Sequence, residues 1–542
     1  MAYNLIDERW IPVLRRSGKV EMISPAQIVD REDPPLRIAS PRPDFDGSLL
    51  EFLVGLMQTA GAPATEREWE DELENPPSVD QLKKRLDTVR EAFFLDGDGP
   101  RFMQDLTVTK DPRIARLPVG ALLIDRIGEE GLSDSPSLFA KPGLFKVLSL
   151  PAAAAALMAL QTYAPAGGRG QFTSLRGGGP LTTLVLGDSL WATAWLNVLP
   201  KREFEARVPG DPALTSDAAI FPWTAKTRQG ETPPSSVHPF HHLWGLPRRC
   251  RLEIVEADGE PCAIYGTQAA LGVRSYVGRP EGMSYDGDYR HPWTPYSFSK
   301  PGEPWNPKKG SADGLPYRDW PLLVTGSEKR RPATVISYFA TTRRRELLGG
   351  AARLVAFGYA MDNMKPLRWC RAETPLVTVD EQLSPTFSGQ VESLVVVSEE
   401  VRKTLATQVR TALSNRPTDL DVFDQVNPAF WSATESAFFR TLQAVKAELE
   451  GGKTADEPKE AWLASLHAAA LALFTRFTDC SADLAAPDLR RVVLARRSLV
   501  QFTSPAAPKL RKLLGLAAPN ESNANAPRAR SARRRPTQES VR

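Results

Sequence analysis

Residues 167–186 read GGRGQFTSLRGGGPLTTLVL, a glycine-rich run that leads directly into a short apolar segment. Its first 13 residues contain six glycines and two arginines. Glycine reaches positive φ and lets another backbone approach closely, although ordering it costs about 0.5–1 kcal/mol relative to alanine. Residues 181–186 are rich in β-branched side chains and predict a buried strand. We therefore expect a shaped loop at the edge of a strand.

The composition is typical of a globular protein in a reducing compartment. The 542 residues are enough for two or more domains, and an apolar content of 42% supports a sizeable core. No stretch approaches 18 consecutive apolar residues, and the N-terminus lacks a basic and then apolar leader, so we expect a cytoplasmic chain with no membrane partner. Four widely spaced cysteines without a CxxC motif predict free thiols.

Positive charge gathers near the end of the sequence. The formal net charge is +3, but residues 519–542 hold six arginines against two glutamates, which leaves the preceding residues near −1. We predict a disordered basic tail over 517–542, because this segment has little apolar content. Nucleic-acid contacts of the folded body must then come from local patches, since the bulk charge supplies no attraction.

Residues 1–383 predict a mixed α+β domain. Alternating apolar and polar residues indicate a small β-hairpin within residues 1–30. Helical spacing of the apolar residues predicts a helix with a buried face over 46–60 and a shorter helix over 189–199. The helix over 46–60 is expected to belong to the core of the domain.

The later part of this domain is less regular. Residues 246–266 alternate in polarity and predict a second hairpin, with its turn at Asp258-Gly259. Residues 274–320 mix aromatic, proline and glycine residues with several arginines and lysines. So long an irregular segment inside a domain indicates either a binding surface or undetected elements.

Helical periodicity dominates from residue 384 onward. Apolar residues recur at helical spacing in four successive stretches, separated by proline or glycine breakers. The periodic positions are Leu394, Val397, Val401 and Leu405, then Phe438, Leu442, Val445 and Leu449, then Leu463, Leu466, Ala470, Phe474 and Phe477, then Leu489, Val493 and Leu499. Short connections between such helices predict an antiparallel four-helix bundle over 384–516. The predicted fold class is α+β, a large mixed N-terminal domain followed by this bundle.

The glycine-rich run does not match the phosphate-binding templates. A P-loop needs GxxxxGK[ST] at the head of a helix, and no lysine follows these glycines. The dinucleotide fingerprint GxGxxG fails because Thr173 stands where its third glycine is required. An enzyme that uses this glycine loop on a phosphorylated ligand stays an alternative function, but we expect neither catalysis nor a cofactor.

Three histidines, His238, His241 and His242, lie close together in the sequence, with Cys250 and Cys262 downstream. Their spacing matches no recognised zinc pattern. We interpret them as structural histidines, and a metal site is the alternative.

A binding role fits the glycine-rich run better than catalysis. Glycines let a loop abut the narrow minor groove of DNA, where side-chain bulk is excluded and base readout is degenerate. Arg169 and Arg176 would then contact phosphates. The alternative is a glycine-rich turn packed against the protein itself, because glycine clusters often serve backbone geometry. These residues alone leave both interpretations open.

Four further motifs occur in order along the chain. They are NLIDERWIPV at 4–13, LRGGGPLTT at 175–183 with LNVL at 196–199, WGLPRR at 244–249, and GYAMDNMK at 358–365. Together they resemble the large subunit of the type I-E Cascade CRISPR surveillance complex, the CasA family. The likeness spans residues 1 to about 515, and it implies a globular N-terminal domain followed by a four-helix bundle.

The resemblance implies a subunit that is not an enzyme. Such a subunit reads the protospacer-adjacent motif on duplex DNA from the minor groove and helps open the duplex for pairing with the guide RNA. The implied partners are the other crRNA-guided Cascade subunits, the crRNA 5′ handle region, double-stranded target DNA and a recruited helicase-nuclease. A purely structural bridging subunit is the remaining alternative.

The resemblance also implies a glycine loop and a duplex-opening wedge. The loop matches Gly167, Gly168 and Gly170, and the wedge matches the segment 362–364. Residues 176–179 are then expected to shape the turn into the following strand. The family carries a glutamine at the wedge tip, where this sequence has asparagine or methionine; a shorter amide or an apolar side chain can also unstack a base step.

Two further assignments follow from the resemblance. A basic residue that reaches the minor groove is assigned to Arg279, and a loop that contacts the RNA handle and the neighbouring subunit is matched by Leu138 and Phe139. The implied DNA-contacting set is Gly167, Gly168, Arg169, Gly170, Arg279, Asp362, Asn363, Met364 and Lys365.

Overall fold

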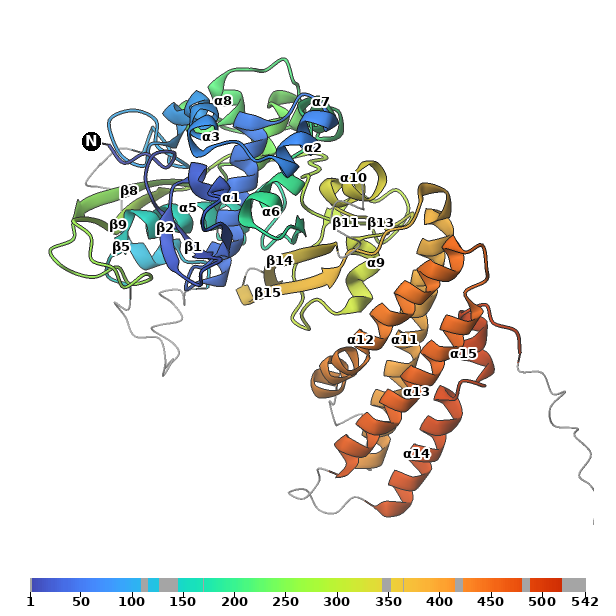
Figure 1. Cartoon of the computed structure of the whole chain (residues 1–542). Coiled ribbons are helices and arrows are strands. Elements are labelled where there is room, and N and C mark those ends of the chain that lie inside the picture. Colours follow the sequence, from blue (N-terminus) through green and yellow to red (C-terminus); the bar gives the residue numbers. More distant parts are fainter. Residues whose placement is uncertain are drawn as a thin grey trace, which may run out of the picture. The chain divides into compact units, whose positions relative to one another are not determined.

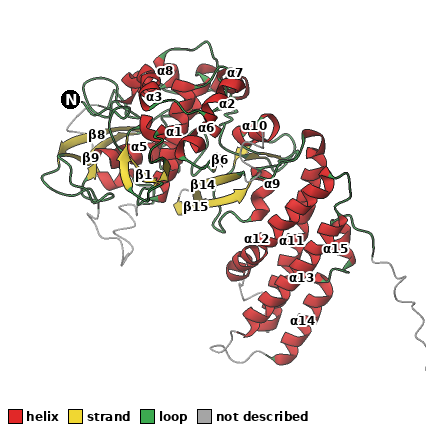
Figure 2. Ribbon diagram, viewed as in Figure 1, coloured by secondary structure: helices red, strands yellow, loops and turns green. Residues whose placement is uncertain are grey.

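The computed structural model describes residues 2–108, 116–125, 145–168, 170–343, 352–363, 365–414, 423–479 and 488–518. The chain divides into two units, one that ends at Ser388 and one that begins at Gly389 (Figure 1). The first unit mixes helices with small sheets, and the described part of the second unit is helical (Figure 2). The predicted mixture of helices and strands is confirmed. The predicted site residues Leu138, Phe139, Arg169 and Met364, and residues 519–542 of the predicted tail, lie outside the described residues.

Helix α1 (Pro43–Gly61) forms the core of the first unit and confirms the helix predicted over 46–60. Phe52 on α1 has no exposed surface, and four aromatic rings surround it edge-on, those of Trp10, Phe93, Phe102 and Trp244. The alanine-rich helix α5 (Leu150–Tyr163) packs beside α1. The other helices are α2 (Glu66–Glu74), α3 (Val79–Leu86), α6 (Leu190–Leu196), α7 (Lys201–Arg207), α8 (Asp217–Ile220), α9 (Trp320–Leu323) and α10 (Thr334–Thr342). Helix α6 confirms the shorter predicted helix.

Small sheets surround these helices. Their strands are β1 (Ile11–Arg15), β2 (Val20–Ile23), β3 (Pro35–Ile38), β4 (Arg116–Pro118), β5 (Leu148–Ser149), β6 (Thr182–Leu186), β7 (Glu231–Thr232), β8 (Arg249–Glu256), β9 (Leu271–Arg279), β10 (Ser284–Tyr285), β11 (Tyr296–Ser297), β12 (Asn306–Pro307), β13 (Arg330–Arg331), β14 (Arg353–Asp362) and β15 (Lys365–Pro375). The antiparallel pair β1–β2 confirms the first predicted hairpin. Strand β6 confirms the strand predicted after the glycine-rich run, and it forms a sheet in the order β15-β14-β6.

The second predicted hairpin is wrong in its returning arm. Strand β8 lies where the first arm was expected, but it pairs antiparallel with β9, so the true connection spans residues 257–270. The turn at Asp258-Gly259 does form, with both residues at positive φ. Pro261, which has no amide hydrogen, follows the turn, whereas 271–279 offers an uninterrupted strand. The start of the segment expected to be irregular is therefore a nine-residue strand.

Helix α11 (Ser384–Leu413) begins at the end of the first unit and continues into the second. The described part of the second unit also contains the long helices α12 (Phe423–Glu450), α13 (Asp456–Asp479) and α14 (Leu489–Thr503), and the short helix α15 (Pro508–Leu513). Helix α13 packs against α12 and α14, and the indole of Trp462 on α13 donates to the Leu394 carbonyl of α11. Of the three periodic apolar residues on α14, Leu489 and Val493 are 78% and 64% exposed, whereas Leu499 is buried. Among the described residues, no helix is both long and apolar enough to span a bilayer.

Candidate nucleic-acid interface

The glycine loop, which we define as residues 167–171, closes on itself through two backbone hydrogen bonds. The Gly167 amide donates to the Gln171 carbonyl at 3.1 Å, and the Gln171 amide donates to the Gly168 carbonyl at 3.3 Å. Gly168 and Gly170 have φ of +67° and +76°, a region that favours glycine. Gly167 and Gly168 are exposed, so the first half of the loop presents backbone to solvent.

The second half of the glycine loop is packed against the protein. The Glu281 amide donates to the Gly170 carbonyl at 2.7 Å. A Cβ at position 170 would lie 2.8 Å from Pro280 Cβ and 2.9 Å from the Glu281 nitrogen, closer than van der Waals contact allows. A Cβ at 168 would meet nothing within 4 Å, and one at 167 would make ordinary contacts at 3.6 Å or more. The packed-turn interpretation therefore accounts for Gly170 but not for Gly167.

The predicted Arg279 lies beside this loop. It is the last residue of β9, directly before Pro280 and Glu281, and it is half-buried. Its register partner across the β8–β9 ladder is Arg249. The structure thus brings together the glycine loop and Arg279, two features that lie more than a hundred residues apart in the sequence.

Two arginines that the prediction did not include hold these segments in place. The Arg248 guanidinium donates to Oε1 of Gln171, the last residue of the glycine loop, at 2.6 Å and to the carbonyl of Pro165, two residues before the loop. The Arg249 guanidinium bonds Asp105 and donates to the Pro280 carbonyl at 3.4 Å. Both arginines belong to the WGLPRR motif, so the sequence singled out these residues. It did not indicate that they hold the glycine loop and the end of β9 in place.

Asp105 holds the Arg249 guanidinium through an ion pair. Its side chain is buried, which on its own would raise its pKa, but hydrogen bonds from Thr227, Thr107 and Arg249 lower the pKa below its ordinary value. Asp105 therefore stays ionised and keeps Arg249 in one orientation.

The predicted wedge is the tip of a long β-hairpin. Strands β14 and β15 pair antiparallel up to Asp362 and Lys365, which leaves residues 363 and 364 as the connection. Asp362, Asn363 and Lys365 are exposed. Asn363 has φ of +51°, a conformation that asparagine tolerates better than most residues. Its side-chain amide Nδ2 donates to Asp362 Oδ1 at 3.2 Å. The hairpin therefore presents an exposed tip with an unusual backbone at Asn363.

A glycine turn at 177–179 ties the glycine loop to the hairpin. The Gly179 amide donates to the Tyr163 carbonyl at 2.9 Å, at the end of α5 and just before the loop. A Cβ at 178 would lie 2.8 Å from Pro165 Cα, and one at 179 would lie 2.8 Å from Met361 Cγ on β14. Only glycine permits both approaches, so this turn packs against the residues that precede the glycine loop and against β14 next to the hairpin tip.

Arg176 supports the fold, as expected of residues that shape the turn into β6, and its burial leaves it unavailable for the alternative role of a phosphate contact. Its side chain is buried and forms an ion pair with the buried Glu51 of α1 at 2.6 Å. It also donates to Thr182 and Thr294 at 2.7 and 3.2 Å. The Tyr163 hydroxyl donates to the second Glu51 oxygen at 2.6 Å. Sequence reasoning missed Glu51 because its partner lies 125 residues away.

The three neighbouring histidines are buried and hydrogen-bonded to the protein. His238 Nδ1 accepts from the Phe240 amide, His241 Nε2 bonds the Tyr285 hydroxyl at 3.0 Å, and His242 Nε2 bonds the Pro209 carbonyl at 2.7 Å. Burial lowers the pKa of His238 to about 4 and of both other rings to about 3. Within the described ranges, no group of three or more histidine, cysteine or acidic side chains is placed to hold a metal ion. The structural interpretation accounts for these rings.

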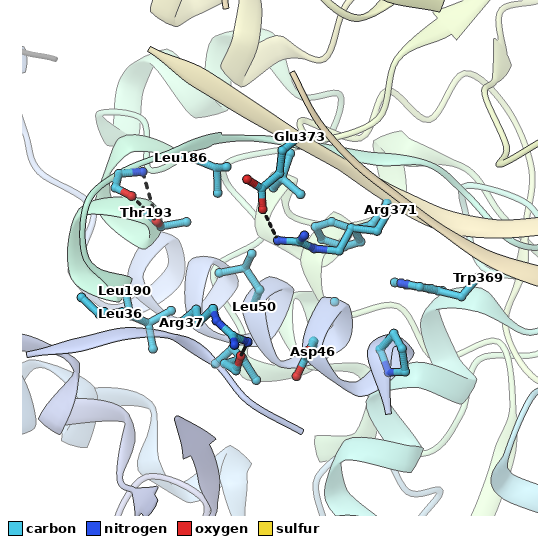
Figure 3. Close-up of a pocket in the computed structure, with 16 residues that line it drawn as sticks. Leu36, Arg37, Asp46, Leu50, Leu186, Leu190, Thr193, Trp369, Arg371 and Glu373 are labelled. Carbon is cyan, nitrogen blue, oxygen red and sulfur yellow. Dashed lines mark hydrogen bonds and ion pairs between the residues drawn. The ribbon is translucent and has the colours of Figure 1, made fainter. Parts of the chain in front are cut away.

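A cleft of about 500 Å³ lies between α1 and one face of the β15-β14-β6 sheet (Figure 3). Its walls combine apolar and polar surface, with Trp369, Arg371 and Glu373 reaching in from β15. Burial raises the pKa of Asp46, which lines the opposite wall, to about 6. None of the described residues of the glycine loop lines this cleft.

Comparison with known structures shows the same fold in proteins of low sequence identity. The structure of Thermus thermophilus CasA (Cse1) is 22% identical, with a TM-score of 0.66 over 95% of this chain and 99% of that chain. Thermobifida fusca Cse1 is 17% identical, with a TM-score of 0.68 over 95% and 99%. A chain of a CRISPR RNA-guided surveillance complex is 16% identical, with a TM-score of 0.64 over 93% and 99%.

The family follows from the sequence itself. The model of the CRISPR-associated protein Cse1 family matches residues 4–473. The chain therefore belongs to the Cse1 family, and the resemblance carried by the four sequence motifs is confirmed.

Proposed function

We propose that this chain is the non-catalytic Cascade subunit that recognises the protospacer-adjacent motif in duplex DNA and helps open the duplex for guide pairing. The observation that carries the proposal is the shared scaffold of the glycine loop and the hairpin tip. The glycine turn at 177–179 packs on Pro165, which lies next to the glycine loop, and on Met361, which lies next to the hairpin tip. A chain of the same fold occurs in a CRISPR RNA-guided surveillance complex, which supports a place among crRNA-guided subunits.

The proposed division of labour follows from what each segment offers. Exposed backbone at Gly167 and Gly168 can enter a narrow groove that excludes side chains, and Arg279 beside it supplies positive charge. The exposed tip at Asn363 can insert between base steps and unstack them. The protein would then read the motif and the duplex shape, while base pairing with the guide RNA reads the sequence.

The remaining parts of the proposal concern partners. The second unit, as a four-helix bundle, and the loop around Leu138 and Phe139 would contact the other Cascade subunits and the crRNA 5′ handle. The assembled complex would then recruit the helicase-nuclease. A purely bridging subunit would leave motif selectivity unchanged when the chain is omitted from the complex, so that omission separates the two functions.

The decisive experiment changes Gly167 to aspartate in the assembled complex. This position has ordinary φ and room for a Cβ, so the fold should survive while a carboxylate repels the DNA backbone. Binding of motif-bearing duplex should be abolished, and binding of a pre-opened target should be spared. Gly99→Asp is the matched control, because Gly99 is also exposed, has ordinary φ and has open space around it. Equal loss on both targets, or no loss on either, contradicts the proposal.

A further inference from the structure

Glu281 is an acidic residue in an unexpected place, at the contact between the glycine loop and the end of β9. Its amide donates to the Gly170 carbonyl at 2.7 Å, and a Cβ at position 170 would lie 3.3 Å from Glu281 Cγ. The residue is exposed. A carboxylate here opposes the positive charge expected of a surface that binds the DNA backbone, so its position indicates a different partner.

The backbone around Glu281 is held on both sides. Glu281 has φ of +63°, which is rare for a residue with a side chain. The Pro280 carbonyl accepts from Arg249, and the Met283 amide donates to the Leu246 carbonyl at 3.1 Å. A Cβ at Gly282 would overlap the Pro247 carbonyl oxygen, at 1.9 Å, so this segment lies flush against residues 246–249. The backbone conformation of Glu281 is therefore fixed, and with it the direction of its Cα–Cβ bond.

The Glu281 carboxylate has no partner in the part of the chain that the structure describes. The hydrogen bonds of this residue there involve its backbone amide and its carbonyl, which accepts from Gln229 Nε2 at 3.5 Å, and none reaches its carboxylate oxygens. An ionised carboxylate offers only acceptors. A ligand that approaches the glycine loop must therefore present a hydrogen-bond donor at this point or leave the carboxylate hydrated.

In the minor groove, donors are scarce. An A·T pair shows only the acceptors adenine N3 and thymine O2, and a G·C pair adds a single donor, the guanine N2 amino group. Phosphates on either side of the groove repel a carboxylate. The favourable contact available to Glu281 is thus a hydrogen bond from guanine N2.

We infer that Glu281 is a specificity-determining residue that accepts a hydrogen bond from guanine N2, so that the recognised motif carries a G·C pair where it faces Glu281. This inference rests on the proposed function and adds a base preference to it. Arg279, two residues earlier, would serve the acceptors that every base pair shows in this groove. The two side chains together would distinguish G·C from A·T within a motif a few base pairs long.

The test measures binding of the assembled complex to a duplex library that varies the motif. Glu281→Ala should lower the preference for G·C over A·T at one motif position by roughly 5- to 100-fold, the range of a good base contact. Glu281→Gln keeps an acceptor oxygen and should retain the direction of the preference. Glu256→Ala is the matched control. It removes an exposed carboxylate at the far end of the β8–β9 ladder, roughly 23 Å away at about 3.3 Å per residue, and should change nothing.

The outcomes separate this inference from the proposed function. A uniform change in affinity across all motifs, or an unchanged motif profile in Glu281→Ala, overturns the inference, because the carboxylate would then act through charge alone or not at all. If the unaltered complex shows no motif selectivity that depends on this chain, the proposed function fails instead. The complexes with Glu281→Ala and Glu281→Gln should bind a pre-opened target like the unaltered complex, which confirms that both variants are folded and assembled.

Discussion

The buried ion pair between Arg176 and Glu51 gives the sharpest prediction about stability. Their side chains are 4% and 1% exposed, and the guanidinium and carboxylate lie 2.6 Å apart. Removing one member of such a pair leaves the other charge buried without a counter-ion, which typically costs about 3–5 kcal/mol. We therefore expect Arg176→Met and Glu51→Gln each to destabilise the first unit by about that amount.

The double variant should be much less harmful than the sum of the two single changes. With both charges gone, no uncompensated ion stays in the core, and the amide oxygen introduced by Glu51→Gln can still accept from the Tyr163 hydroxyl, as the carboxylate does at 2.6 Å. We expect the double variant to be more stable than additivity predicts by at least about 2 kcal/mol, since contacting residues couple by about 0.5–3 kcal/mol. Arg207 and Glu203 provide the exposed control pair. They lie 3.0 Å apart with 46% and 42% of their side chains exposed, so Arg207→Met should cost under about 1 kcal/mol.

Urea-dependent hydrogen exchange read by mass spectrometry suits this measurement, because a chain of two units need not unfold in one step. Peptides that cover β6 report the free energy of opening in the first unit alone. Costs for Arg176→Met and Glu51→Gln that add up in the double variant would refute the reasoning. A cost for Arg176→Met no larger than that for Arg207→Met would refute it as well.

Three further predictions concern backbone geometry and pH. Gly168→Ala should lower the free energy of unfolding by about 1 kcal/mol, because of its positive φ alone. Gly170→Ala should lower it clearly more, because its Cβ would also lie 2.8 Å from Pro280. Thermal unfolding compares the two variants, and equal losses would contradict this prediction. The pKa values of His241 and His242 are lowered from 6.5 to about 3, so the unfolded chain binds protons first as pH falls. The free energy of unfolding should therefore drop by about 1.6 kcal/mol per histidine between pH 6.5 and 5. Urea titrations at the two pH values measure this drop, and a His241→Phe/His242→Phe variant should show a flatter profile. At φ +51°, Asn363→Val should destabilise the hairpin tip by about 1–2 kcal/mol, whereas Asn363→Gly should be neutral. Thermal unfolding measures both variants. Equal effects would show that the backbone at this position has relaxed.

Much of the fold could be predicted because its signals are local. Helix α1, the β1–β2 hairpin and strand β6 each carry their periodicity within a dozen or two residues, and the helices of the second unit do so over longer stretches. The pairing of β8 with β9 could not be predicted in the same way, because the segment just after the Asp258-Gly259 turn is nearer in sequence and also alternates in polarity. Only the packing of the whole domain decides which segment pairs.

The candidate site was predictable where backbone chemistry defines it and not where a distant partner defines it. The glycines at 167–170 and the tip at Asn363 were visible in the sequence as residues suited to unusual backbone. Arg176 was not, because an arginine in a glycine-rich run fits a phosphate contact as well as a buried ion pair until Glu51 is placed beside it. Glu281 also needed the structure, which places it against Gly170.

The glycine-rich run contains glycines of different kinds, and the difference decides which of them informs on function. Gly170, Gly178 and Gly179 are required by close approach, since a Cβ at each would lie 2.8 Å from a neighbouring atom. Gly168 is required by its φ alone. Within the described parts of the chain, neither close packing nor a positive φ requires glycine at 167. A side chain at 167 therefore tests what approaches the loop from outside, whereas one at 170 would test mainly whether the loop still packs on Pro280 and Glu281.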